Sequence, residues 1–255
     1  MTAQFQEEHY QVNGTQVVAL TAGQGPEVVF LHGAGTFPGF APALPWAENH
    51  KVIIPYHVHF GKSGSSDTIQ TIDDHVLHYM DLFDQMQLEN FSLAGFSMGG
   101  WIAAEFAIRQ PKRVKNLTLV APAGLVIAEV NQPNLLELQP EEIPSYLTHD
   151  PAVALSYFPQ EPDPNFDAQL GREMQGLAAT LAANPKGNPR LKNWLHRARM
   201  PTLLVWGEND RLLPITLAEH WQHYLPNAQL RRLPKTGHLV LEESPDASRL
   251  IKEFL

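Results

Sequence analysis

Short apolar segments rich in Val, Ile and Leu recur along this chain of 255 residues, and helix-like segments separate most of them. These segments are hydrophobic on both faces, which is typical of central strands in a parallel sheet that helices cover on both sides. Parallel strands need long crossover connections, and the helix-like segments can supply them. We expect six such strands, at residues 27–31, 51–56, 91–95, 116–121, 202–207 and 228–233.

A hairpin and three helices complete this pattern. Asn13 and Gly14 separate two strand-like segments, and Asn-Gly is the strongest short signal for a hairpin. Together these elements predict an α/β fold with a doubly wound, mostly parallel sheet of eight strands, whose ligands bind at the carboxyl ends of the strands. The expected helices lie at residues 71–86, 97–110 and 214–225.

Composition and charge exclude several classes of protein. Apolar residues make up 44% of the chain and charged residues 18%, which is unlike a disordered chain or a coiled coil. The net charge of -9 argues against nucleic acid or a membrane surface as a partner. The chain has no cysteine, and therefore no disulfide, thiolate metal ligand or cysteine nucleophile. Residues 1–12 lack a signal-peptide pattern, and no apolar run reaches the roughly 18 residues of a membrane span, so we expect a cytoplasmic protein.

The alternation of strands and helices is interrupted between residues 123 and 196, where prolines are frequent. A structureless loop of this length is implausible in a compact domain. We therefore expect two units: a core of residues 1–122 and 197–255, and a helical cap over residues 123–196, inserted after the sixth strand. The aromatic side chains of the insertion could form its own core or line a pocket, and they are Tyr146, Tyr157, Phe158, Phe166 and Trp194.

The sequence FSLAGFSMGG contains a candidate nucleophile. A predicted strand ends at Gly95, Ser97 follows two residues later, and Gly99 lies at the start of a predicted helix. The pattern G-x-S-x-G between a strand and a helix is typical of a nucleophile elbow, in which a strained turn projects the serine hydroxyl outward. The alternative is a glycine-rich turn with an incidental serine, because the five-letter pattern alone is common by chance.

A nucleophilic serine needs a base, and the base needs an orienting acid. His238 follows the predicted strand at 228–233, and Asp210 follows the strand at 202–207. The order Ser97, Asp210, His238 along the chain differs from the orders of the chymotrypsin and subtilisin triads. Glu208, two residues before Asp210, is the rival for the acid.

A third element is the loop after the predicted strand at 27–31. His32, Gly33, Ala34 and Gly35 leave room for backbone amides to point at a substrate carbonyl. We expect an oxyanion hole that combines the N–H of Ala34, or of its neighbour Gly35, with the N–H of Met98. The ring of His32 is expected to brace this loop through hydrogen bonds rather than to act as a base.

These motifs together resemble the α/β hydrolase superfamily, in the branch with a helical cap after the sixth strand. The resemblance covers nearly the whole chain and implies that the cap roofs the pocket and selects the substrate. Dehalogenases and epoxide hydrolases of the superfamily have aspartate where this chain has Ser97, and carbon–carbon bond hydrolases usually have tryptophan where it has Leu239. The matching segments are residues 32–35, 60–64, 95–100, 207–214 and 236–245.

The expected function is that of a serine hydrolase that cleaves a small or medium carboxylic ester through an acyl-enzyme. A small-molecule acyl substrate is the partner that this function implies, no cofactor or metal is required, and the oligomeric state is left open. The alternatives are carbon–carbon hydrolysis, perhydrolysis or thioester cleavage by the same three residues, or a ligand receptor without catalysis.

The twelve histidines offer a weaker metal-site hypothesis. Pairs at 75–78 and 220–223 lie on expected helix faces, but no carboxylate accompanies them as in most zinc or iron sites. We therefore expect solvated histidines and no metal site, with His57 and His59 near the rim of the pocket.

Overall fold

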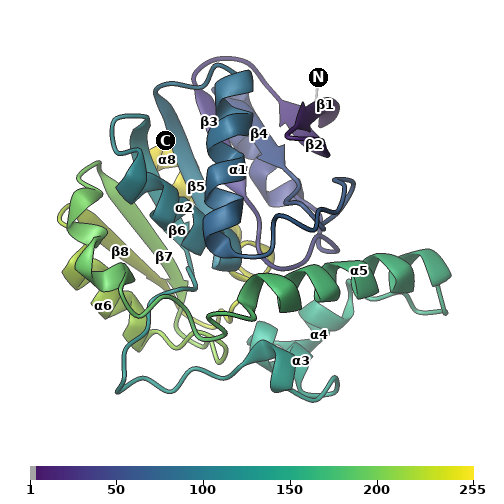
Figure 1. The fold of residues 1–255 in the computed structure, drawn as a ribbon. Helices are drawn as coiled ribbons and strands as arrows, with labels where there is room; N and C mark the ends of the chain where they lie inside the picture. The colour runs from purple at the N-terminus through teal and green to yellow at the C-terminus, as the bar shows by residue number, and fades with distance from the viewer. Residues whose placement is uncertain (1–3) are drawn as a thin grey trace.

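The computed structural model describes residues 4–255, and its eight strands form one sheet (Figure 1). Residues 1–3, where the predicted core unit begins, lie outside the described residues. The strand order is β1-β2-β4-β3-β5-β6-β7-β8, with β2 antiparallel to β1 and to β4 and every other pair parallel. The strands are β1 (Gln6–Val12), β2 (Thr15–Ala22), β3 (Glu27–Leu31), β4 (Lys51–Pro55), β5 (Phe91–Phe96), β6 (Val114–Val120), β7 (Thr202–Gly207) and β8 (Ala228–Leu233).

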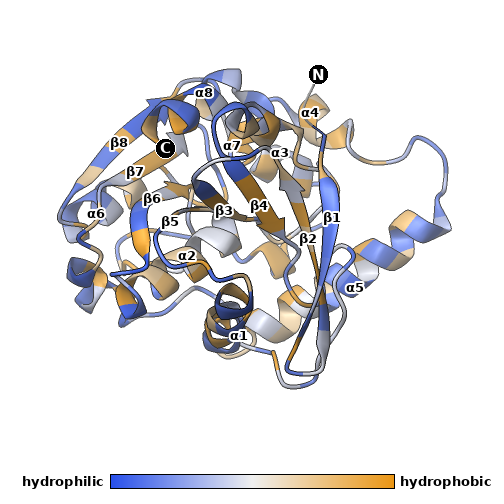
Figure 2. Cartoon of the chain, turned by 90° about the horizontal axis from the view of Figure 1, so that it is seen from above, coloured by the Kyte–Doolittle hydropathy of each residue, from blue (hydrophilic) through white to orange (hydrophobic). Residues whose placement is uncertain are grey.

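Helices cover both faces of this sheet, as expected for an α/β fold. Seen from above, α1 and α2 lie on one side of the strands and α7 and α8 on the other (Figure 2). Among residues 4–255, no helix has the length and apolar character needed to cross a bilayer. The α-helices are α1 (Ile72–Gln85), α2 (Ser97–Arg109), α3 (Ile143–Leu147), α4 (Pro151–Leu155), α5 (Pro164–Leu181), α6 (Thr216–Tyr224), α7 (Val240–Glu243) and α8 (Pro245–Phe254).

Local sequence signals explain where these elements begin and turn. Asn13 and Gly14 have φ angles of 50° and 82°, as the two central residues of a type I′ hairpin turn require. The Thr71 hydroxyl accepts a hydrogen bond from the N–H of Asp74 at 3.1 Å, which caps α1. The predicted hairpin and the three predicted helices are therefore confirmed.

Five of the six predicted strands are buried as expected, but β8 is an edge strand with alternating exposure. Arg231 and Arg232 are exposed there, so the interpretation of β8 as a central strand was wrong. The two arginines fit an edge position, because charged side chains discourage pairing with a further strand.

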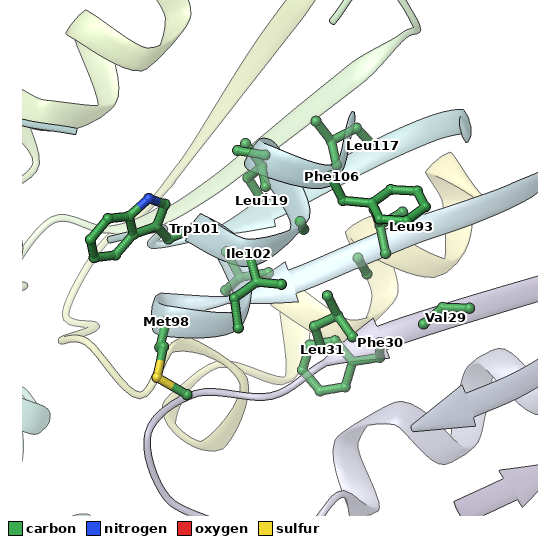
Figure 3. Close-up of a cluster of buried hydrophobic side chains, with 14 of the residues drawn as sticks. Val29, Phe30, Leu31, Leu93, Met98, Trp101, Ile102, Phe106, Leu117 and Leu119 are labelled. Carbon is green, nitrogen blue, oxygen red and sulfur yellow. The ribbon is translucent and has the colours of Figure 1, made fainter. Parts of the chain in front are cut away.

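Helix α2 packs closely on the centre of the sheet, and this packing places Ser97. Ile102 and Phe106 of α2 lie over Leu93 of β5 in the buried cluster of Figure 3. A Cβ atom on Gly99 would come within 2.1 Å of the Leu31 carbonyl oxygen, so only glycine permits this approach. The first turn of α2 is thereby held against the end of β3.

Three helices, α3 to α5, lie between β6 and β7 in the sequence and beyond the carboxyl ends of the strands in space (Figure 1). We call residues 121–201 the β6–β7 segment. Two of its parts that are distant in sequence meet, because the N–H of Asn188 donates to the carbonyl of Gly124 at 2.8 Å. The expected helical insertion is therefore present, whereas its separation at residues 123 and 196 into a unit of its own stays a prediction.

Candidate active site

Ser97 lies on a strained turn between β5 and α2. Its φ angle of 52° is in the left-handed region, which is uncommon for a residue other than glycine. Gly95 makes the turn possible, because a Cβ atom there would come within 2.4 Å of the Gly99 carbonyl oxygen. The side chain of Ser97 lines the large cavity at the carboxyl edge of the sheet.

A line of hydrogen bonds runs from Ser97 into the protein. His238 Nε2 lies 2.9 Å from Ser97 Oγ, and His238 Nδ1 lies 2.8 Å from Asp210 Oδ2. The other carboxylate oxygen of Asp210 accepts the N–H groups of Leu212 at 3.0 Å and Leu213 at 2.7 Å. With Nδ1 donating to Asp210, Nε2 of the neutral ring is free to accept the serine proton.

The rival acid, Glu208, takes no part in this line. Its side chain is exposed, although its backbone N–H donates to the Leu233 carbonyl at 2.9 Å. Asp210 instead lies in the turn after β7, where its side chain is fully buried. The structure thus brings Asp210, and not Glu208, to His238.

The ring of His32 is held inside the loop that follows β3. The N–H of His57 donates to His32 Nε2 at 3.0 Å, so the ring proton lies on Nδ1 and donates to the Gly33 carbonyl at 2.6 Å. Burial lowers the pKa of His32 to about 4 and holds the pKa of His57 well below its usual range. Both rings are therefore neutral at physiological pH, and Tyr79 donates to His57 Nδ1 at 2.5 Å.

Gly33, Ala34 and Gly35 line the cavity beside Ser97. Met98 follows Ser97 in the first turn of α2, where backbone N–H groups have no partner within the helix. Within the described part of the chain, the N–H groups of Ala34 and Met98 donate to no protein acceptor. Both amides are therefore available to a ligand.

The cavity above Ser97 is apolar and has a volume of about 590 Å³, which is typical of a small-molecule site. Glu242 is the only acidic residue among its lining side chains, and no lysine or arginine lines it. Burial raises the pKa of Glu242 to about 7, although nearby His238 acts in the opposite direction. The side chains from the β6–β7 segment are all apolar, and they are Leu135, Pro140, Ile143, Pro144, Leu147, Leu155, Phe158, Leu170 and Met174.

The aromatic side chains of the β6–β7 segment were expected either to form its own core or to line a pocket, and they do not all behave alike. Phe158 lines the cavity and packs against Phe166 at a ring distance of 5.7 Å. Trp194 is 51% exposed, and neither it nor Tyr157 lines the cavity. The structure therefore does not place Tyr157 or Trp194 in the cavity wall.

The expectation of solvated histidines was wrong for three of them. His57, which follows β4, and His75 and His78 of α1 are buried, and the rings of His57 and His75 lie 5.8 Å apart. His57 lies behind the His32 loop rather than at the cavity rim, and His59 Nε2 donates to the Ile69 carbonyl, 2.8 Å away. No group of three or more metal-binding side chains occurs among residues 4–255.

Glu242 is a site residue that the sequence analysis did not single out. It stands four residues after His238, on the short helix α7 that the histidine loop leads into. An acidic residue one helical turn beyond a candidate catalytic histidine is the signal that could have found it.

Comparison with known proteins identifies the family of this chain. A family model described as "Alpha/beta hydrolase family" matches residues 28–248. Human monoacylglycerol lipase is 28% identical over 91% of this chain and 76% of its own length, and a 2-hydroxy-6-oxo-6-phenylhexa-2,4-dienoate hydrolase from Burkholderia cepacia is 28% identical over 92% and 89%. A serine hydrolase from Cycloclasticus zankles shares the fold, with a TM-score of 0.81, 22% identity and 98% of both chains covered. The chain is thus a member of the alpha/beta hydrolase family, and it is an enzyme.

Proposed function

We propose that this enzyme is a serine hydrolase that cleaves neutral carboxylic esters with an apolar acyl chain. The observation that supports this most directly is the line of hydrogen bonds that begins at Ser97 in an apolar cavity and runs through His238 to the buried Asp210. A nucleophile, a base and an orienting acid within hydrogen-bond distance are the arrangement that acyl transfer needs.

The reaction has two stages. Ser97 Oγ attacks the ester carbonyl while its proton passes to His238 Nε2, and collapse of the tetrahedral intermediate breaks the bond to the alcohol oxygen, which takes that proton. Water then gives a proton to His238 and attacks the acyl-enzyme, and the carboxylic acid leaves as Ser97 recovers its proton. Asp210 stabilises the imidazolium form of His238 in both stages.

The oxyanion of each tetrahedral intermediate is assigned to the N–H groups of Ala34 and Met98. Both amides lack a protein partner among the described residues, and the second lies at the positive end of the α2 dipole. One such donor contributes about 3 kcal/mol of transition-state stabilisation. Gly33, Gly35 and the ring of His32 support the loop.

The chemistry of the cavity favours a neutral ester over the carbon–carbon substrates of some relatives. A hexadienoate carries a carboxylate, and burying an unpaired carboxylate in apolar surroundings is costly. The cavity offers no lysine or arginine to pair with it, and Glu242 would repel it. A neutral lipid-like ester, the type of substrate named for the monoacylglycerol lipase, avoids this cost.

The β6–β7 segment is assigned the role of a cap over this site. It contributes one whole wall of the cavity, and the N–H of Leu239, next to the base His238, donates to the Leu147 carbonyl in α3 at 2.8 Å. Selection of the acyl chain is therefore assigned to residues of the segment, and bond cleavage to residues of the sheet edge.

A covalent probe and an ester panel test this proposal. A fluorophosphonate should label the enzyme once, at Ser97, and Ser97→Ala should remain folded, unlabelled and inactive, while the exposed-site control Ser65→Ala behaves as wild type. Among esters from acetate to palmitate and a 2-hydroxy-6-oxohexadienoate, the neutral esters should be cleaved fastest. Labelling at another serine, or faster cleavage of the dienoate, would contradict the proposal.

A further inference from the structure

Glu173 is a buried carboxylate on α5 that takes no part in the proposed reaction. It is 2% exposed and accepts several hydrogen bonds from the core. Its Oε2 accepts the N–H of Thr36 at 3.0 Å, and its Oε1 accepts the Thr36 hydroxyl at 2.5 Å and the N–H of Gly61 at 2.9 Å. A carboxylate with this many donors is strongly anchored, since hydrogen bonds to charged groups are the strong ones.

Helix α5 is held in register on the core by the same face. A Cβ atom on Gly176 would come within 2.4 Å of the His59 Cβ, so the helix backbone lies directly against the side chain of His59 there. One turn further, the Thr180 hydroxyl lies 3.3 Å from Nε2 of the buried His75. The carboxylate of Glu173 therefore projects from a fixed position and not from a mobile helix.

The bonds to Thr36 reach the loop that is assigned to the oxyanion hole. Gly33 and Gly35 flank Ala34, and glycine has the widest choice of backbone angles, so contacts from outside the loop must fix its direction. One end is fixed by the ring of His32, bonded to Gly33 and to the His57 N–H. The other end is fixed at Thr36 by Glu173, and Ala34 lies between the two anchors.

We propose that Glu173 is a positioning residue of the oxyanion hole, which through the backbone of Thr36 sets the direction of the Ala34 N–H. This inference rests on the proposed function. It makes the β6–β7 segment part of the rate-determining machinery as well as a wall of the cavity. If the Ala34 N–H is displaced, its hydrogen bond to the oxyanion of the transition state weakens. Binding of the substrate in its ground state depends instead on the apolar walls of the cavity.

The alternative is that Glu173 only attaches α5 to the core. Its loss would then loosen the helical wall, and the effect would fall on KM for long acyl chains, which touch that wall at Met174 and Leu170. A short ester such as 4-nitrophenyl acetate would be little affected. The two cases therefore differ in the kinetic parameter and in the substrate that changes.

The test uses Glu173→Gln, which keeps the shape of the side chain. Both carboxylate oxygens of Glu173 accept hydrogen bonds, whereas the glutamine amide has only one accepting oxygen and an NH₂ group in place of the other. The control on the same helix is Asp167→Asn, which removes an exposed carboxylate. We expect Glu173→Gln to lower kcat for 4-nitrophenyl acetate by roughly 10- to 100-fold, with KM within about threefold of wild type. The control should behave as wild type. Thr36→Ala, which keeps the N–H bond and loses the hydroxyl bond, should cause a smaller loss of kcat.

A second measurement follows the loop directly. Hydrogen exchange of the amides at residues 33–37 should accelerate in Glu173→Gln and remain at the wild-type rate in Asp167→Asn. An unchanged kcat together with a raised KM for palmitate, or unchanged exchange at 33–37, would overturn the proposal. Wild-type enzyme that cleaves no ester would instead contradict the proposed function, and the exchange result would then still decide whether Glu173 fixes the loop.

Discussion

On the core side of the cavity the polar side chains Ser97, His238 and His32 each have a hydrogen-bonded partner, whereas the side formed by the β6–β7 segment offers only apolar surface. The hydrogen bonds hold the polar side chains of the core side in fixed orientations, because each bond fixes an atom to within a few tenths of an ångström. The side chains that the β6–β7 segment turns toward the cavity are apolar and can select a substrate only by its shape. The comparison teaches that rate and selectivity should respond to different substitutions.

The largest effect is expected where the core side loses the orientation of its base. Asp210→Asn keeps the size of the side chain but presents an amide to His238, which favours the wrong ring tautomer. We expect kcat to fall by roughly 10⁴-fold on every ester, as in other triads. Steady-state kinetics on a short and a long ester check this, and the loss should be the same for both.

Glu208→Gln is the matched control for this prediction. Its side chain is exposed, so the variant should keep nearly wild-type kinetics. The assignment of the acid would be wrong if Glu208→Gln were the crippled enzyme and Asp210→Asn the active one.

A smaller effect, on selectivity alone, is expected on the helical side. Phe158 lies against Phe37 at a ring distance of 5.4 Å, and Phe158→Ala would enlarge the cavity at that point. Since a hydrophobic pocket discriminates by about 1–3 kcal/mol per methylene, kcat/KM should shift by ten- to a few hundredfold between acyl lengths. The rate of labelling of Ser97 by a small phosphonate should stay near that of wild type.

Trp194→Ala serves as the control on the same segment. Because its side chain is 51% exposed and does not line the cavity, the profile of acyl lengths should not move. An equal shift in both variants would mean that the segment acts through stability and not through the cavity wall.

The two sides also differ in how far the sequence predicts them. The strands, α2 and the positions of Ser97, Asp210 and His238 follow from local signals, because periodicity and turn glycines act over a few residues. The cavity-facing residues of the β6–β7 segment do not. Phe158 and Trp194 are both aromatic residues of this segment, and the sequence does not distinguish them. The tertiary packing does, because Phe158 packs against Phe37, a residue far away in sequence, and lines the cavity, whereas Trp194 is exposed.

The burial of several polar residues could not be predicted from the sequence for a related reason. Glu173 resembles any acidic residue on an amphipathic helix, and His75 and His78 resemble solvated residues of α1. Their burial depends on which segments pack against each helix face, and this is not encoded in the helix sequence alone. Glu173 finds hydrogen-bond partners on its buried face, whereas the ring nitrogens of His78 have none among the described residues. For Glu173 that partner is a loop 137 residues away in sequence.

The smallest effect concerns Glu242, the one ionisable carboxyl in the cavity wall. Its pKa of about 7 means that it is neutral below pH 7 and ionised above it. Wild-type enzyme should therefore discriminate against a carboxylate-bearing ester, relative to its neutral isostere, more strongly as pH rises through 7. At an effective dielectric of about 20 this repulsion amounts to roughly 1–2 kcal/mol, or about tenfold in the ratio of kcat/KM values.

Glu242→Gln should remove this pH dependence, and kcat for the neutral ester should change little. The same variant gives an independent check on stability. Between pH 4.5 and about 7 the folded protein holds a proton on Glu242 that the unfolded chain has lost, so this residue makes the free energy of unfolding fall as pH rises. Urea unfolding at several pH values in that range should show that the free energy of unfolding falls less steeply with pH in Glu242→Gln than in the wild type. If the discrimination against carboxylates persisted unchanged in the variant, the apolar walls alone would exclude anionic substrates, and the charge of Glu242 would have no part in the contrast between the two sides of the cavity.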